Sequence, residues 1–224
     1  MPSALDVRAS DFVLRSPLQP KDNGVSLLSP GALERVVRGL ARAGRPYGLV
    51  TNQFQAELVS PKLAERYVDA FYPEPQLLVR LALDRIELST PKVRRRAREL
   101  AIELFDAIVA ELGESLGVEN GATTALNLHV SGADPSVFPQ LPQGPALGPP
   151  AAGGIVFNYG AAPWDDSVVA TSLVLEPSVA FEQAMFIGLR NVWRPDSQRL
   201  SARFDRHLRE VQRVAGIELR ETGE

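Results

Sequence analysis

The stretch PKVRRRARELAIELFDAIVAELGESLG, residues 91–117, carries the strongest helical pattern in the chain. Its polar positions Glu99, Glu103 and Asp106 recur at steps of four and three, so they form a narrow stripe. Apolar side chains cover most of the remaining circumference: Leu100, Ala101, Ile102, Leu104, Phe105, Ile108, Val109 and Leu112. A helix with so wide an apolar arc packs on a sheet and on other helices together. We therefore predict one long, buried helix here, with its three carboxylates on a solvated face.

The segments around this helix alternate between helical and extended patterns. Further helices are predicted from Pro30, from Pro61 to 72, from Pro177 to 192 and from Pro195 to 215. Strands are predicted within 47–59, 76–88, 123–130, 155–159, 168–175 and 217–219. This order is typical of an α+β fold, a mainly antiparallel sheet with helices packed on one face. No internal repeat is visible in the sequence.

One domain accounts for most of the chain. Pro17, Pro20 and the turn at 21–24 interrupt any regular element near the start, so residues 1–28 are predicted to be an extended N-terminal arm. Residues 29–224 are predicted to be a single α+β domain. The Pro/Gly-rich segment 131–154 lies between two strands of one sheet, so we interpret it as an insertion and not as a domain boundary.

Composition excludes several classes of function. The chain has 224 residues, no cysteine and a formal charge of −3. The absence of cysteine excludes disulfides, thiolate catalysis and iron–sulfur clusters, and the weak net charge gives no general attraction to nucleic acid or anionic lipid. No apolar run approaches the roughly 18 residues of a spanning helix, and residues 1–10 lack the apolar core of a signal peptide. We expect a cytoplasmic protein with no cofactor, and the excess of arginine and proline suggests a bacterial or phage genome.

The strand predicted at 123–130 carries a polar face. Asn127, His129 and Ser131 alternate with apolar residues and end at the long Pro/Gly segment. This face is a candidate for binding a polar ligand or for supplying a general base; the alternative is a solvated sheet face. Ser131 and His129 lie on one strand, and no G-x-S-x-G sequence marks a nucleophile.

A second candidate is the turn Trp164-Asp165-Asp166. An indole beside two carboxylates can form a corner that binds a sugar or a cation. The simpler alternative is that the carboxylates cap the turn while Trp164 covers a sheet edge. No H-E-x-x-H sequence and no EF-hand loop is present, so no metal site is predicted.

The densest cationic run is a candidate anion site. Arg94, Arg95, Arg96 and Arg98 lie at the start of the long helix, where cations oppose the helix dipole unless an anion binds there. A second basic stripe is predicted on the last helix, at Arg199, Arg203, Arg206 and Arg213. These arginines could contact nucleic acid or phosphate; the alternative is ordinary helix-surface charge paired with nearby carboxylates.

The segment 131–154 departs furthest from average composition. It combines frequent proline and glycine with bulky apolar residues, namely Val137, Phe138, Leu141 and Leu147. Long loops without regular structure are usually functional or disordered, and a disordered linker carries fewer large apolar side chains. We predict that these four residues bind a partner, the alternative being a flexible loop in solvent.

Our first hypothesis for the function is a non-enzymatic binding or assembly protein. It would be a subunit of a homo- or hetero-oligomeric bacterial or phage complex, with contacts made by the Pro-rich loop and the N-terminal arm and no membrane association. One alternative is a small hydrolase or ligand-binding enzyme with a site near Asn127, His129 and Asp165. The other is nucleic-acid or phosphate binding through the Arg94–Arg98 run.

Overall fold

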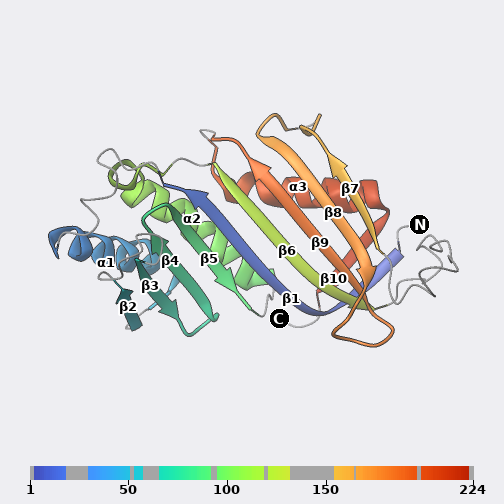
Figure 1. Ribbon diagram of the computed structural model, residues 1–224, viewed down its shortest axis with the longest axis horizontal. Helices are drawn as coiled ribbons and strands as arrows, with labels where there is room; N and C mark the ends of the chain where they lie inside the picture. Colours follow the sequence, from blue (N-terminus) through green and yellow to red (C-terminus); the bar gives the residue numbers. More distant parts are fainter. Residues whose placement is uncertain are drawn as a thin grey trace, which may run out of the picture.

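The computed structural model describes residues 3–18, 30–50, 53–57, 66–91, 95–118, 121–131, 154–163, 165–195 and 198–221. These residues form an α+β fold with one mainly antiparallel sheet, as the sequence predicts (Figure 1). The helices are α1 Pro30–Gly44, the short 3-10 helix η2 Arg45–Tyr47, α2 Arg95–Leu116 and α3 Leu200–Ala215. The strands are β1 Ser3–Pro17, β2 Gln53–Glu57, β3 Tyr67–Tyr72, β4 Leu77–Ala82, β5 Arg85–Thr90, β6 Ala122–Ser131, β7 Ile155–Tyr159, β8 Val168–Pro177, β9 Met185–Trp193 and β10 Ile217–Glu221.

The strand β1 lies in the middle of the sheet, whose order is β2-β3-β4-β5-β1-β6-β9-β8-β7. It pairs antiparallel with β5 on one side and with β6 on the other, and its first residues pair in parallel with β10. Phe12 and Leu14 of β1 are completely buried. The predicted N-terminal arm is therefore wrong for residues 3–17, which form an interior strand; residues 19–28 lie outside the described part of the chain.

The sheet contains the same arrangement twice, although the sequence shows no repeat. In the first unit β1 pairs with the last strand of the β3-β4-β5 meander, and α2 follows. In the second unit β6 pairs with the last strand of the β7-β8-β9 meander, and α3 follows. Because β1 and β6 are antiparallel neighbours, an approximate two-fold axis normal to the sheet relates the two units.

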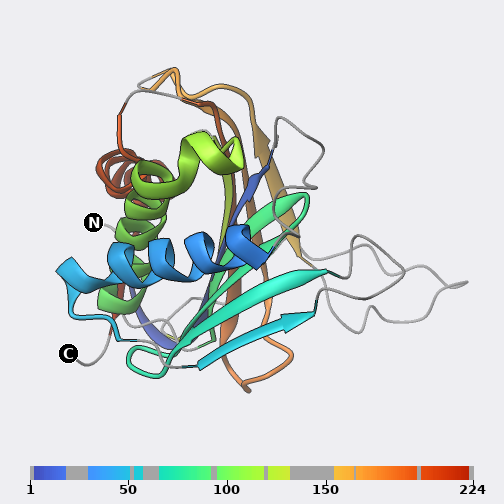
Figure 2. The same cartoon turned by 90° about the vertical axis from the view of Figure 1, so that its left-hand side faces the viewer.

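All three α-helices lie on the same side of the sheet (Figure 2). Side chains of α2, among them Leu104, Phe105 and Ile108, are fully buried beneath them. Gly39 lets α1 cross close to α2, since a Cβ there would lie 2.5 Å from a methyl of Leu112. Within the described ranges no helix is long and apolar enough to cross a membrane. We refer to the other side of the sheet, which no described helix covers, as the open face.

Two predicted helices are strands. Residues 67–72 form β3, although Leu63, Tyr67, Val68 and Phe71 have helical spacing. Residues 185–193 form β9, in which the alternate residues Met185, Ile187 and Leu189 are buried. A spacing of four residues fits one face of a helix and one face of a strand alike, so the period does not separate the two in short segments.

The prediction that Asp106 belongs to a solvated stripe is also wrong. Its carboxylate is buried and caps the first turn of α3. It accepts hydrogen bonds from the Leu200 amide at 2.8 Å, the Ser201 amide at 3.0 Å and the Ser201 hydroxyl at 2.7 Å. Arg199, at the N-cap position of α3, makes no such bond, so α2 supplies the cap that α3 lacks.

Candidate binding site on the open face

A ladder of paired charges crosses the open face. Asp69, Arg80, Glu87 and Arg15 are neighbours on β3, β4, β5 and β1. Arg80 donates two hydrogen bonds of 2.8 Å to Asp69, and these bonds are the main cause of the raised pKa of Arg80. Arg15 donates to Glu87 at 2.7 Å. The ladder therefore neutralises itself, and cross-strand pairs of this kind stabilise a sheet modestly.

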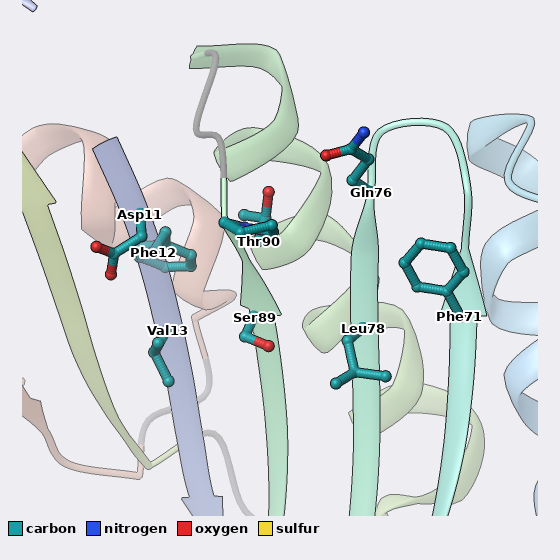
Figure 3. A pocket seen from close by; sticks show the side chains of 9 residues that line it. Asp11, Phe12, Val13, Phe71, Gln76, Leu78, Ser89 and Thr90 are labelled. Atoms are coloured by element: carbon teal, nitrogen blue, oxygen red, sulfur yellow. The ribbon is translucent and has the colours of Figure 1, made fainter. Parts of the chain in front are cut away.

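A hollow of about 420 Å³ lies beside this ladder. Its floor is the next row of side chains across the same four strands: Phe71, Leu78, Ser89 and Val13 (Figure 3). With strands about 4.8 Å apart, such a row spans about 14 Å. Ser89 is the smallest member of the row and lies between Leu78 and Val13, so the floor dips there and its walls are apolar.

The rim of the hollow carries polar groups that are not fully paired. Asp11 lies at the β1 end, with its carboxylate turned toward β6 (Figure 3), where it accepts a hydrogen bond of 2.8 Å from the Asn127 amide. Within the described part of the chain, Asn127 is its only side-chain partner. The Thr90 hydroxyl also lines the hollow; its side chain is 1% exposed, and its oxygen has no hydrogen-bond partner.

His129 forms a separate polar contact on the open face. Its Nδ1 lies 2.8 Å from the Ser178 hydroxyl oxygen. That oxygen already accepts bonds from the Ala180 and Phe181 amides, at 3.2 and 3.1 Å. Ser178 therefore donates its own proton to Nδ1, and the neutral imidazole carries its hydrogen on Nε2. This serine oxygen caps a turn and is not held as a nucleophile.

Two phenyl rings enclose the His129 side chain. The centroids of Phe181 and Phe186 lie 5.3 Å from that of the imidazole. The Phe186 ring passes over Gly188, where a Cβ would lie 3.1 Å from it. His129 is thus half-buried in an aromatic cluster, beside the Asp11–Asn127 pair of the neighbouring strands.

The residues of the enzyme hypothesis do not meet. His129 lies opposite Phe186, near the start of β9, whereas Asp165 contacts Val168, which lies opposite Trp193 at the other end. Seven residues of strand separate these positions, about 23 Å. Asp165 accepts bonds from the Ser167 amide at 2.9 Å and hydroxyl at 2.5 Å, so it caps its own turn.

The remaining candidates of that hypothesis give no further grouping. Asp166 is exposed on the same turn, and Trp164 lies outside the described residues. Ser131 ends β6 opposite Asp6 and is half-buried. In the described ranges no group of histidine, aspartate and glutamate side chains has an arrangement that could hold a metal ion.

The arginines of the predicted anion site point to different surroundings. Arg95 pairs with Glu99 at 2.9 Å, and Arg96 lies 3.6 Å from Glu99 and 3.7 Å from Glu103. Arg98 is buried, and Arg94 lies outside the described residues. The described arginines of α2 are therefore ion-paired on their own helix or buried.

The second basic stripe is also not a uniform surface. Arg203 is 2% exposed; it lies over the Trp193 ring, 5.7 Å from its centroid, and donates to the Arg194 carbonyl at 3.1 Å. Arg213 pairs with Glu210 at 2.8 Å. The sequence places both on α3 but does not reveal that one of them is interior.

The helix-covered side of the second unit holds a buried polar network around His207. The His207 Nε2 lies 3.0 Å from both the Asn191 side-chain oxygen and the Thr171 hydroxyl. The Asn191 amide donates to Thr124, at 3.4 Å, so its oxygen is the acceptor and His207 is the donor. Burial lowers the pKa of His207, and the charge of Asp165 opposes that shift.

The strand β7 offers a different kind of surface. It ends the sheet path, pairing with β8. Its sequence Ile155-Val156-Phe157-Asn158-Tyr159 contains no charge, and Val156, Phe157 and Tyr159 are 57%, 41% and 45% exposed. The Phe157 and Tyr159 rings stack with centroids 6.5 Å apart. The predicted partner-binding residues Val137, Phe138, Leu141 and Leu147 precede this strand and lie outside the described residues.

Sequence reasoning finds Asn127 and His129 but misses their partners. Asp11 lies 116 residues from Asn127 in the chain, and Ser178 lies 49 residues from His129. Such contacts depend on strand register, which residue spacing does not reveal. In comparisons with known proteins, no family model matches this chain, and no curated protein does either.

Proposed function

We propose that this protein is a non-enzymatic assembly protein whose copies associate through the β7 edge of the sheet. The observation that carries the proposal is an edge strand with large exposed apolar side chains and no charge. Edge strands present unpaired backbone groups, and proteins usually protect them with charge, proline or a bulge. The other end of the sheet is different: β2 has Gln53, Gln55 and Glu57 and no large exposed apolar residue.

The absence of charge favours a second copy of the chain as the partner. A two-fold axis through the middle of β7 pairs Phe157 with its counterpart, Ile155 with Tyr159, and Val156 with Asn158. A charge at the axis would then face itself, which destabilises the pair. Every residue of β7 is compatible with this arrangement, and the exposed aromatic rings add apolar area to the backbone hydrogen bonds.

The segment 131–154 contributes to the same interface in this proposal. It leaves the sheet at the end of β6, where Val130 lies opposite Met185, and it leads directly into β7. The exposed side chains of Val179 and Phe181 lie on the turn between β8 and β9, at the same end of the sheet. Burying Phe138, Leu141 and Leu147 on such a surface would contribute about 1.5–3 kcal/mol for each side chain before ordering costs.

The test is the mass of the protein in solution. Phe157→Lys places like charges against each other at the two-fold axis, so we expect the oligomer to dissociate to monomers in light scattering or sedimentation. The matched control is Gln55→Lys, which adds the same charge to the opposite edge strand and should leave the mass unchanged.

Two results would contradict the proposal. One is a wild-type protein that is monomeric at every concentration up to the solubility limit. The other is an oligomer whose mass is the same in wild type and in Phe157→Lys while circular dichroism shows both to be folded.

A further inference from the structure

We propose that the hollow on the open face binds a small organic cation with an apolar body, such as an alkylammonium ion. This site is distinct from the β7 edge and does not depend on association of subunits. It is assigned from three properties of the hollow, namely its size, its apolar floor and the character of the polar atoms on its rim.

The size of the hollow fits one small molecule. A volume of about 420 Å³ lies at the lower end of the roughly 300–1,000 Å³ found for small-molecule sites. The floor of Phe71, Leu78 and Val13 is suited to an alkyl chain or a ring, and its length of about 14 Å exceeds that of a six-carbon chain. Burial of the ligand's apolar body on this floor supplies the non-specific part of the affinity.

The charge of the rim selects a cation. The four charges of the neighbouring ladder are paired with one another, as Arg80 is with Asp69 and Arg15 is with Glu87. Asp11 has no ion pair among the described residues and keeps only the neutral amide of Asn127. A half-buried carboxylate at the end of an apolar hollow gains most from a ligand that supplies a positive charge and N–H donors.

Two hydroxyls strengthen this choice. The oxygens of Ser89 and Thr90 line the same hollow, and no described residue donates a hydrogen bond to either. Both can accept a hydrogen bond from an N–H group. The polar groups on the β1 and β5 side of the hollow are therefore acceptors or hydroxyls, a set that an ammonium group satisfies and a carboxylate does not.

The experiment compares three probes that have the same body: hexylammonium, hexanol and hexanoate. Titration of the full-length, isotope-labelled protein is followed by NMR, with amide shifts of β1, β4 and β5 as the readout. We expect hexylammonium to bind at least about tenfold more tightly than hexanoate, because a charge-assisted hydrogen bond contributes about 1.5–3 kcal/mol. Hexanol should lie between the two.

Two variants test the two parts of the site. Asp11→Asn removes the charge with little change in shape and should abolish the preference for hexylammonium over hexanol. Ser89→Leu fills the floor and should weaken all three probes. Asp84→Asn changes an exposed aspartate at the opposite end of the β4–β5 hairpin, so it should bind the probes like the wild type.

Three outcomes would overturn the inference. These are hexanoate binding as tightly as hexylammonium, a cation preference that survives in folded Asp11→Asn, and no shift with any probe at millimolar concentration. The Phe157→Lys protein should bind hexylammonium normally, so failure of subunit association and failure of this site are separate results.

Discussion

Asp106 stabilises α3 although it belongs to α2. Its two oxygens accept three hydrogen bonds from Leu200 and Ser201, and its negative charge lies at the positive end of the α3 dipole. A helix start that is buried needs such acceptors, because unpaired N–H groups away from water are costly. One carboxylate therefore joins the helices of the two structural units.

We expect Asp106→Ala to lower the free energy of unfolding by about 1–3 kcal/mol, since it leaves the first amides of α3 without an acceptor. Urea unfolding measures the change. Glu103→Ala is the matched control on the same helix: its nearest cation, Arg96, is 3.7 Å away and well exposed, so a loss below about 1 kcal/mol is expected. Equal losses in the two variants would show that the cap has no special role.

The buried imidazole of His207 links stability to pH. Burial lowers its folded pKa below the model value of 6.5. As the pH falls, the unfolded chain therefore binds the proton before the folded protein does. The stabilising contribution of the neutral network is fully present above about pH 6.5 and is lost as the pH falls through the window between the two pKa values.

We expect the free energy of unfolding to decrease between pH 7.5 and 5.5, by at most about 1.4 kcal/mol for each pH unit if one proton is involved. Urea unfolding at several pH values measures this slope. His207→Gln should be less stable but should show a smaller slope. His129→Gln, which changes the other histidine of the chain, is the control and should keep the slope. A wild-type slope that persists in His207→Gln would refute the assignment.

At the scale of the elements, the signals in the sequence are unequal. The apolar stripes that predict α1 and α3 are long enough to fix their period, and β6 alternates cleanly. The strand β1 is hidden for two reasons. A bulge between Val7 and Ala9 breaks its alternation, and its buried face includes the small polar residues Ser10 and Ser16. Neither feature looks like a strand in the centre of a sheet.

The candidate sites were less predictable than the elements. Polar residues on the visible alternating strand, Asn127 and His129, can be found by inspection. The hollow cannot, because it exists only when β3, β4, β5 and β1 are aligned in register. Its central residue, Ser89, was part of an ordinary alternating run in the sequence.

The segment before β7 provides a prediction at this scale. Replacing residues 135–150 by a short Gly/Ser linker should lower the oligomer mass, because the linker lacks the apolar residues proposed to lie in the interface. Light scattering and thermal unfolding measure mass and stability. Lower stability at unchanged mass would place these residues on their own subunit, and no change in either quantity would exclude a role in association.

At the scale of the whole molecule, the repeated arrangement places two four-stranded units side by side. Their seam is the pairing of β1 with β6, and it is crossed on the open face by the Asp11–Asn127 hydrogen bond and on the helix side by the Asp106 cap of α3. The seam is thus held on both sides of the sheet. The two units are expected to unfold together, since neither can be removed without exposing a long interior strand.

The place of β1 also has a consequence for the chain as it is synthesised. Phe12 must find Leu126, which is made 114 residues later, and Leu5 must find Leu219. Until β6 has left the ribosome, β1 is the outer strand of the first unit, with its backbone groups open to any other nascent chain. Contacts over such distances close slowly, so the growing polypeptide passes through a long interval in which its own future centre is its stickiest edge.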